Sequence, residues 1–162
     1  MKPYAGIGSR ETPREILEIM TNMAKALGDL GFTLRSGGAD GADLAFELGA
    51  TSKEIYLPWR GFNGNKSPLY EVCAEAEAFA KRYTPYWNNC SIGAKKLKAR
   101  NIYQLLGKDL KSPSLFGVCW TPGGVAVGGT GLNINIAKEI GIKIFNLFSC
   151  DSKEVIEYAS SL

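Results

Sequence analysis

Apolar positions in the first third of the chain change their period from strand-like to helix-like and back again. The segment 4–8 is short and apolar, as in a buried strand, and apolar residues at helical spacing follow Thr12 and Pro13 up to position 30. A second apolar segment at 32–34 predicts another strand, and the apolar residues of 44–48 predict a short helix. This stretch therefore predicts a strand–helix–strand–helix unit.

The same alternation continues to the end of the chain. Strands are expected at 53–57, 114–120 and 142–145, and helices at 69–83, 93–106, 134–140 and 152–160. The strand at 114–120 is almost uninterrupted in its apolar character, which is typical of burial on both faces of a parallel sheet. Residues 58–68 are rich in glycine, asparagine and aromatic side chains and predict a long loop, of a length that is more often functional than accidental.

Strands that alternate with helices predict a three-layer, Rossmann-like α/β fold with a mostly parallel sheet. With 162 residues, of which 45% are hydrophobic, the chain can bury one core but is short for two, so we expect a single domain over 1–162. Ligands of such folds bind beyond the carboxyl ends of the strands. The chemistry of this chain is therefore expected in the segments that follow its strands.

Three glycine-containing segments follow predicted strands. They contain Gly8, Ser9 and Arg10; then Arg35, Ser36, Gly37, Gly38, Asp40 and Asp43; and then Gly128, Gly129 and Thr130. Glycine allows a positive φ and leaves space beside the backbone, and the N–H groups that begin a following helix favour a negative charge. We therefore expect an anion site, with phosphate as the first ligand to consider. None of the segments matches the patterns of a standard dinucleotide site or of a nucleoside-triphosphate P-loop.

Arginines are the candidates for direct phosphate contacts. Arg10 follows the first strand and Arg35 ends the second, so both are expected to point toward the crevice, where guanidinium can pair bidentately with phosphate. Arg100 lies on the helix predicted over 93–106 and could reach the same place. A solvated or carboxylate-paired arginine is the alternative at each position.

Two kinds of side chain in these segments have several open interpretations. Asp40 and Asp43 could cap a helix, pair with Arg35, or accept hydrogen bonds from sugar hydroxyls. Trp120 and Trp59 follow strands on the ligand side and are candidates for stacking on a base. Burial in the core or in an interface is the alternative for both tryptophans.

Composition narrows the classes of partner. The net charge of +3 comes from mixed charges without a dense basic run, so a dedicated nucleic-acid binder is not favoured. Four widely spaced cysteines and the absence of histidine predict neither a metal site nor a disulfide framework, and we expect no cofactor. No apolar stretch approaches the ~20 residues that span a bilayer, and no signal peptide precedes the first strand, so we expect a cytoplasmic protein without a membrane partner.

Taken together and in order, these motifs resemble the SLOG superfamily. The resemblance depends on residues 6–10, residues 35–43, the pair Arg100 and Asn101, and residues 122–130, and it covers nearly the whole chain. The superfamily includes the Lonely-guy phosphoribohydrolases, the Rossmann domain of DNA-processing protein A, and nucleotide-sensing domains of bacterial defence systems. The chain looks most similar to small stand-alone members from phages and bacteria. The resemblance implies a homo-oligomer, a dimer or larger, and for a phage protein a location in the host cytoplasm.

The chain departs from the Lonely-guy pattern at two positions. That family follows Gly-Thr with a glutamate that helps to cleave an N-glycosidic bond, and the matching position here is Asn133. Asparagine can hydrogen-bond a ribose or a base but cannot act as a carboxylate base or nucleophile. The arginine of the family's Arg-Lys pair is matched by Arg100, but its lysine is Asn101. These differences favour binding of a nucleotide over its hydrolysis.

Three functions are therefore open at this point. The first is binding of a phosphate-containing, nucleotide-derived small molecule, such as a cyclic nucleotide or an ADP-ribose-type signal, which the protein would sequester without turnover. The second is a phosphoribohydrolase or N-glycosidase acting on nucleoside monophosphates, with Asp40 or Asp43 replacing the glutamate and Arg100 assisting. The third is binding of single-stranded DNA, as in DNA-processing protein A, for which the lysines here are dispersed.

Overall fold

The computed structural model describes residues 1–162 and contains five strands and six α-helices. The strands are β1 (Lys2–Gly6), β2 (Phe32–Ser36), β3 (Lys53–Ile55), β4 (Phe116–Cys119) and β5 (Lys143–Asn146). The α-helices are α1 (Arg14–Asp29), α2 (Ala42–Gly49), α3 (Ala74–Arg82), α4 (Ile92–Leu106), α5 (Gly128–Ile140) and α6 (Ser152–Ser160). Short 3₁₀ turns occur at Phe62–Gly64, Trp87–Asn89 and Pro122–Gly124.

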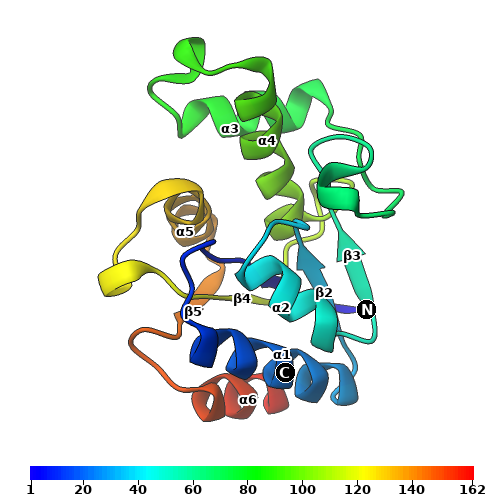
Figure 1. Ribbon diagram of the computed structural model, residues 1–162, viewed down its shortest axis with the longest axis vertical. Coiled ribbons are helices and arrows are strands. Elements are labelled where there is room, and N and C mark those ends of the chain that lie inside the picture. The colour runs from blue at the N-terminus through cyan, green and yellow to red at the C-terminus, as the bar shows by residue number, and fades with distance from the viewer.

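The five strands form one sheet in the order β3-β2-β1-β4-β5, and every neighbouring pair is parallel. Helices cover both faces of this sheet (Figure 1). The predicted three-layer, Rossmann-like α/β fold with a parallel sheet is therefore confirmed. None of the helices combines the length and the apolar character required to cross a membrane.

Two apolar clusters fill the spaces between the sheet and its helical layers. One contains Tyr4, Phe46 and Phe116 and lies under α1, α2 and α6, which cover the same face in Figure 1. The other contains Ile102 and Ile136 and lies under α4 and α5, with α3 packed outside α4. Burial on both faces explains why the strands are apolar at consecutive positions rather than at alternate ones.

The strand order places a topological switch point between β1 and β4. From β1 the chain moves outward to β2 and β3, and it then returns to the other side of β1 to form β4 and β5. The segments that leave β1 and β4 therefore diverge to opposite faces of the sheet, which opens a crevice between them. Two of the three glycine-containing segments follow these two strands.

The structure moves the boundaries of several predicted elements. The helix predicted over 69–83 begins only at Ala74, because Leu69 is extended and pairs its backbone with Tyr56 and Leu57 beyond the end of β3. The helix predicted over 134–140 begins six residues earlier, at Gly128. The last glycine-rich segment is thus partly the first turn of α5 and not only a turn before it.

Candidate functional site

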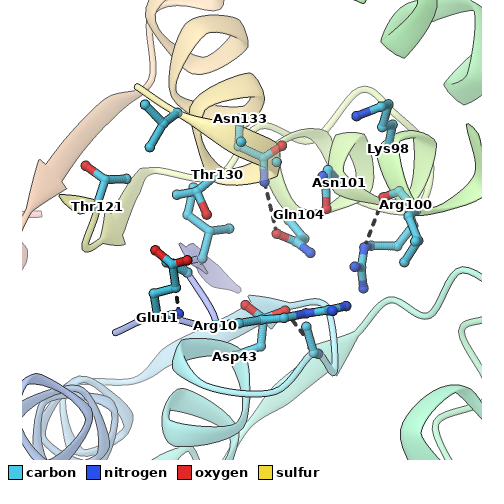
Figure 2. Close-up of a pocket in the computed structure, with 18 of the residues that line it drawn as sticks. Arg10, Glu11, Asp43, Lys98, Arg100, Asn101, Gln104, Thr121, Thr130 and Asn133 are labelled. Atoms are coloured by element: carbon cyan, nitrogen blue, oxygen red, sulfur yellow. Dashed lines mark hydrogen bonds between the residues drawn. The ribbon is translucent and has the colours of Figure 1, made fainter. Parts of the chain in front are cut away.

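A cavity of about 550 Å³ lies at the switch point, beyond the carboxyl ends of β1 and β4. Residues 7–11 after β1, the start of α2, one face of α4, and the segment from Thr121 to the first turns of α5 form its walls. Figure 2 shows that the labelled polar side chains from these elements surround one common space. This is the place where ligands of open α/β sheets bind.

Most of the predicted ligand-binding residues line this cavity. They are Gly8, Ser9, Arg10, Asp43, Arg100, Gly128, Gly129, Thr130 and Asn133. They come from four separate elements, so the tertiary fold brings together residues up to 125 positions apart, from Gly8 to Asn133. The other predicted residues, Arg35, Ser36, Gly37, Gly38, Asp40 and Trp120, lie outside the lining.

Arg35 differs most from its expected position, because its side chain runs toward the far end of α4 instead of into the crevice. It is 3% exposed, its Nε donates to Glu54 Oε1 at 2.8 Å, and its Nη1 donates to the carbonyl of Ser112 at 2.5 Å and to Ser114 Oγ at 3.3 Å. Its guanidinium also fills the space beside Gly107, directly after α4. Arg35 therefore joins β2 and β3 to the segment after α4 and has no access to the cavity.

The remaining predicted residues outside the lining either take part in the packing of the fold or lie exposed on the surface. Ser36 is buried and donates its hydroxyl to the carbonyl of Gly6, which links β2 to β1. Asp40 is exposed and its side chain makes no hydrogen bond or ion pair, so it neither caps α2 nor pairs with an arginine. Trp120 is half-buried and packs against the apolar cluster on the α1 face. Gly38 has a positive φ of 68°, and a Cβ there would lie 2.7 Å from Leu57.

The loop after β1 is fixed to the start of α2 by its own backbone. The carbonyl of Ser9 accepts hydrogen bonds from the Thr12 hydroxyl at 2.6 Å and from the Ala42 N–H at 3.4 Å. A Cβ on Gly8 would overlap the Cβ of Ala42, so glycine is required for this close contact. The glycine thus serves packing, and the packing presents Arg10 at the cavity mouth.

Arg100 is a buried cation that lacks an acidic partner. It is 5% exposed, and it donates Nε to the carbonyl of Leu97 at 3.2 Å and Nη1 to the carbonyls of Gly37 and Tyr56. Its guanidinium group lies over the aromatic ring of Phe62, with 5.4 Å between the guanidinium carbon and the ring centre. Its Nη2 makes no hydrogen bond within the chain, and no carboxylate lies within ion-pair distance. The nearest acidic group, Asp43, acts on it through its charge but forms no ion pair with it. Burial of a charge without a paired counter-charge is unfavourable, so this site favours an anion.

Three side chains that line the cavity pack closely against the backbone of Gly37. A Cβ on this residue would overlap Gln104 Nε2 and Arg100 Nη1 and would lie 2.8 Å from Asp43 Oδ2. The absence of a side chain at Gly37 therefore lets an amide, a guanidinium and a carboxyl converge over one point. The glycine was predicted to admit a ligand, and the structure instead shows it admitting side chains that line the cavity.

Asp43 is a buried carboxyl in the first turn of α2. Burial raises its pKa to about 6, while the nearby charge of Arg100 and hydrogen bonds, including one from the Ala39 N–H at 3.2 Å, oppose the rise. A carboxyl with this pKa exchanges its proton near neutral pH, which is a property of functional carboxyls. Of the two aspartates considered from the sequence, only Asp43 reaches the cavity.

The first turn of α5 forms the opposite wall. Gly128 has a positive φ of 61°, and neither it nor Gly129 has any atom within 4 Å of the place a Cβ would occupy, so their backbone faces open space. Val127, the residue before the helix, supplies no capping hydrogen bond. The first N–H groups of the helix consequently have no intrahelical partner and are available to an anion.

An amide pair lies between these two walls (Figure 2). Asn133 is 2% exposed and donates Nδ2 to Gln104 Oε1 at 3.3 Å, while its own Oδ1 is buried without a partner. Gln104 is 1% exposed, and its Nε2 makes no hydrogen bond within the chain. The pair therefore keeps one donor and one acceptor free beside the cavity, as recognition of a hydroxyl or a base edge requires.

The lining contains five further polar residues, namely Glu11, Lys98, Asn101, Gln104 and Thr121. Thr121 and Asn101 belong to motifs that the sequence singles out, whereas Glu11, Lys98 and Gln104 were not predicted to contact a ligand. Lys98, Asn101 and Gln104 lie on α4 at a spacing of three residues, so they share the face that also contains Leu97. This row of polar residues, on a helix that otherwise packs through apolar side chains, could have predicted from the sequence that this face of α4 lines a polar cavity. The charged lining residues are then Arg10, Lys98 and Arg100 against Glu11 and Asp43, and none of them forms an ion pair.

Comparison with known proteins supports the fold. The chain is similar to the solved structure of DNA processing protein A from Helicobacter pylori, a protein described for its single-stranded DNA binding mode, with a TM-score of 0.58 and 15% sequence identity. The match covers 98% of this chain and 72% of that chain. No family model and no curated protein matches the sequence. At this identity the likeness concerns the arrangement of strands and helices.

Proposed function

We propose that the chain binds a phosphate-bearing, nucleotide-derived small molecule in the cavity at the switch point. The observation that carries the proposal is Arg100, a guanidinium that is 5% exposed, faces the cavity and has no acidic partner in the chain. An anionic group of a ligand would supply the missing counter-charge and accept from the free Nη2.

The rest of the cavity supports a nucleotide as the source of that anion. Its volume of about 550 Å³ is within the range of small-molecule sites, and Arg10, Lys98 and the first turn of α5 add further positive potential. The free donor of Gln104 and the free acceptor of Asn133 match the sugar hydroxyls or the base of a nucleotide. A cyclic nucleotide or an ADP-ribose derivative belongs to this class.

Asn133 supports binding without turnover. The resemblance to Lonely-guy enzymes implies a glutamate at this position, and the amide here can hydrogen-bond a ligand but cannot accept a proton from water. Sequestration of a signalling nucleotide, the use made of such sites by small phage proteins that neutralise defence signals, is the biological role that fits a binding site of this kind.

A hydrolytic activity is the second candidate, and Asp43 is the observation that favours it. This carboxyl lines the cavity, is 6% exposed, and has a pKa of about 6, so it could exchange a proton with substrate or water at neutral pH. The reaction would be hydrolysis of an N-glycosidic bond in a nucleoside monophosphate. Release of free base by the wild type but not by Asp43→Asn would establish this activity.

Mass spectrometry of the molecules released from the purified protein tests the main proposal. The protein is incubated with lysate from cells that make cyclic nucleotides and ADP-ribose derivatives, repurified and denatured. We expect an intact nucleotide in near-stoichiometric amount from the wild type and at least tenfold less from Arg100→Met, because the buried cation is lost. Free base with ribose phosphate would favour hydrolysis instead. An empty cavity together with binding of a labelled oligonucleotide at low salt would favour single-stranded DNA.

A further inference from the structure

Apart from Lys98, whose Nζ donates to Tyr86 Oη at 3.3 Å, the positive groups of the cavity lie in two places and not in one. Arg10 and Arg100 lie on the same side as Asp43, whereas Thr130 and the start of α5 lie on the opposite side (Figure 2). Gln104 and Asn133 lie between them. A single phosphate group cannot contact both sides while the amide pair also contacts the ligand between them.

The arginine side has the features of an unfilled anion subsite. Burial lowers the pKa of Arg100, the carboxylate of Asp43 raises it, and the charge of Arg10 lowers it again, so the two guanidinium groups are close enough to repel each other. Neither forms an ion pair, and Arg10 makes no hydrogen bond within the chain. The one carboxylate near them, Asp43, forms an ion pair with neither. Two like charges that face each other are stabilised when an anion bridges them.

The side formed by α5 has its own unsatisfied groups. The first N–H groups of this 13-residue helix are uncapped, and Thr130, 9% exposed and in the lining, makes no side-chain hydrogen bond. One turn further along the helix, Asn133 Oδ1 is buried without a partner. The single carboxylate here, Glu11, is exposed at the cavity mouth, where solvent screens it.

We propose that the cavity takes a ligand with two separate phosphate groups, one bridging Arg10 and Arg100 and the other on the first turn of α5. This inference rests on the proposed function and specifies its ligand class: a cyclic dinucleotide, whose two phosphodiester groups are held apart by ribose, in preference to a nucleoside monophosphate or to a nucleotide whose phosphates are directly linked. The amide pair of Gln104 and Asn133 then contacts the ribose that separates the two phosphates, or the base that this ribose carries.

Two pairs of variants separate the subsites. Arg10→Gln removes the charge on the arginine side, and Arg10→Lys keeps it. Gly129→Pro removes one N–H from the first turn of α5, where proline is tolerated, and Gly129→Ala adds a side chain but keeps the N–H. Thr130→Val, which removes only the hydroxyl, serves as a second probe of the α5 side if the proline variant does not fold.

Calorimetric titration of the full chain with adenosine 5′-monophosphate, ADP-ribose and cyclic di-AMP gives the test. We expect cyclic di-AMP to bind the wild type at least tenfold tighter than the monophosphate or ADP-ribose does, because the two linked phosphates of ADP-ribose can occupy only one side of the cavity. Arg10→Gln and Gly129→Pro should each lower the affinity for cyclic di-AMP about tenfold, to the monophosphate level, because each removes one of two charge-assisted contacts. The monophosphate should change less than about threefold, since its single phosphate can use the remaining subsite. Arg10→Lys should lose less affinity than Arg10→Gln, and Gly129→Ala less than Gly129→Pro, because each keeps the charge or the N–H that its partner variant removes.

The outcomes separate this inference from the proposed function. Equal affinity of the wild type for adenosine 5′-monophosphate and cyclic di-AMP, or an equal loss for both in one variant, would show a single subsite and overturn the inference while the nucleotide function stands. A wild type that binds none of the three nucleotides would overturn the proposed function, and this inference with it.

Discussion

Two buried arginines in this chain differ in what balances their charge. Arg35 is 3% exposed and pairs with Glu54 at 2.8 Å, whereas Arg100 is 5% exposed and contacts only backbone carbonyls and the ring of Phe62. The first arrangement is a structural ion pair between β2 and β3. The second leaves a buried charge beside the cavity without an ion-pair partner, an arrangement in which a bound anion would be stabilising.

Substitution of each arginine by methionine should separate these roles. Arg35→Met should lower the free energy of unfolding by about 2 kcal/mol, less than for a fully buried pair because the Glu54 side chain is 23% exposed. Arg100→Met should change it by less than about 1 kcal/mol, since methionine keeps the apolar stem and removes a poorly compensated charge, and it should weaken nucleotide binding at least tenfold. Urea denaturation and calorimetry measure both quantities. A larger loss of stability for Arg100→Met than for Arg35→Met would assign Arg100 a structural role.

At the scale of elements, α5 shows where local propensity misleads. Its first four residues are Gly128, Gly129, Thr130 and Gly131, and three glycines among four residues predict a turn, not a helix. The helix begins there because its later apolar residues dock on the sheet, and because Gly131 packs against the backbone of Ala126. The shift matters for function, since it places free N–H groups at the cavity in place of a loose turn.

The glycines of α5 should therefore respond differently to alanine. At Gly131 an added Cβ would lie 2.6 Å from the backbone carbon of Ala126, so Gly131→Ala should lower the free energy of unfolding by about 1–3 kcal/mol. At Gly129 the Cβ would meet open space, and Gly129→Ala should raise stability by about 0.5–1 kcal/mol through helix propensity. Thermal and urea unfolding of the two variants provide the comparison. If both substitutions changed the free energy of unfolding equally, the backbone around Ala126 would be able to move aside for the new methyl group at position 131.

For the whole molecule, the alternation of apolar segments was sufficient to predict a parallel three-layer fold and the edge of the sheet where the site lies. Three of its residues could be placed there from the sequence. Arg10 follows the end of a predicted strand, Arg100 lies on a predicted helix, and Asn133 occupies a known position in the order of motifs. The direction of Arg35 could not, because it depends on space beside Gly107, more than 70 residues further along the chain. Gln104 was missed for a similar reason, since its exposure to the cavity depends on how α4 is rotated against the sheet.

Asp43 connects the site to the stability of the whole fold. Its pKa is raised to about 6 from an ordinary value of 3.8, so the folded protein holds this proton more tightly than the unfolded chain. The protonated carboxyl therefore favours folding below about pH 4, and this contribution is lost as the pH rises through 6. Asp43→Asn keeps the shape without the charge. It should leave stability near pH 4 unchanged and raise the free energy of unfolding by about 2–3 kcal/mol at pH 7.5, as measured by urea denaturation across this range.

The same titration should couple ligand binding to pH. An anion beside Arg100 also lies near Asp43, and like charges raise the pKa of a carboxyl, so the bound state should take up a proton that the free state lacks. Affinity for ADP-ribose, whose phosphates keep their charge between pH 5 and 8, should therefore increase as the pH falls from 7.5 to 5.5. Calorimetry in buffers of different ionisation enthalpy would reveal the proton uptake. In Asp43→Asn the pH dependence should disappear and the affinity at pH 7.5 should increase; a weaker affinity would mean that the carboxylate contacts the ligand directly, through a hydroxyl or a base N–H.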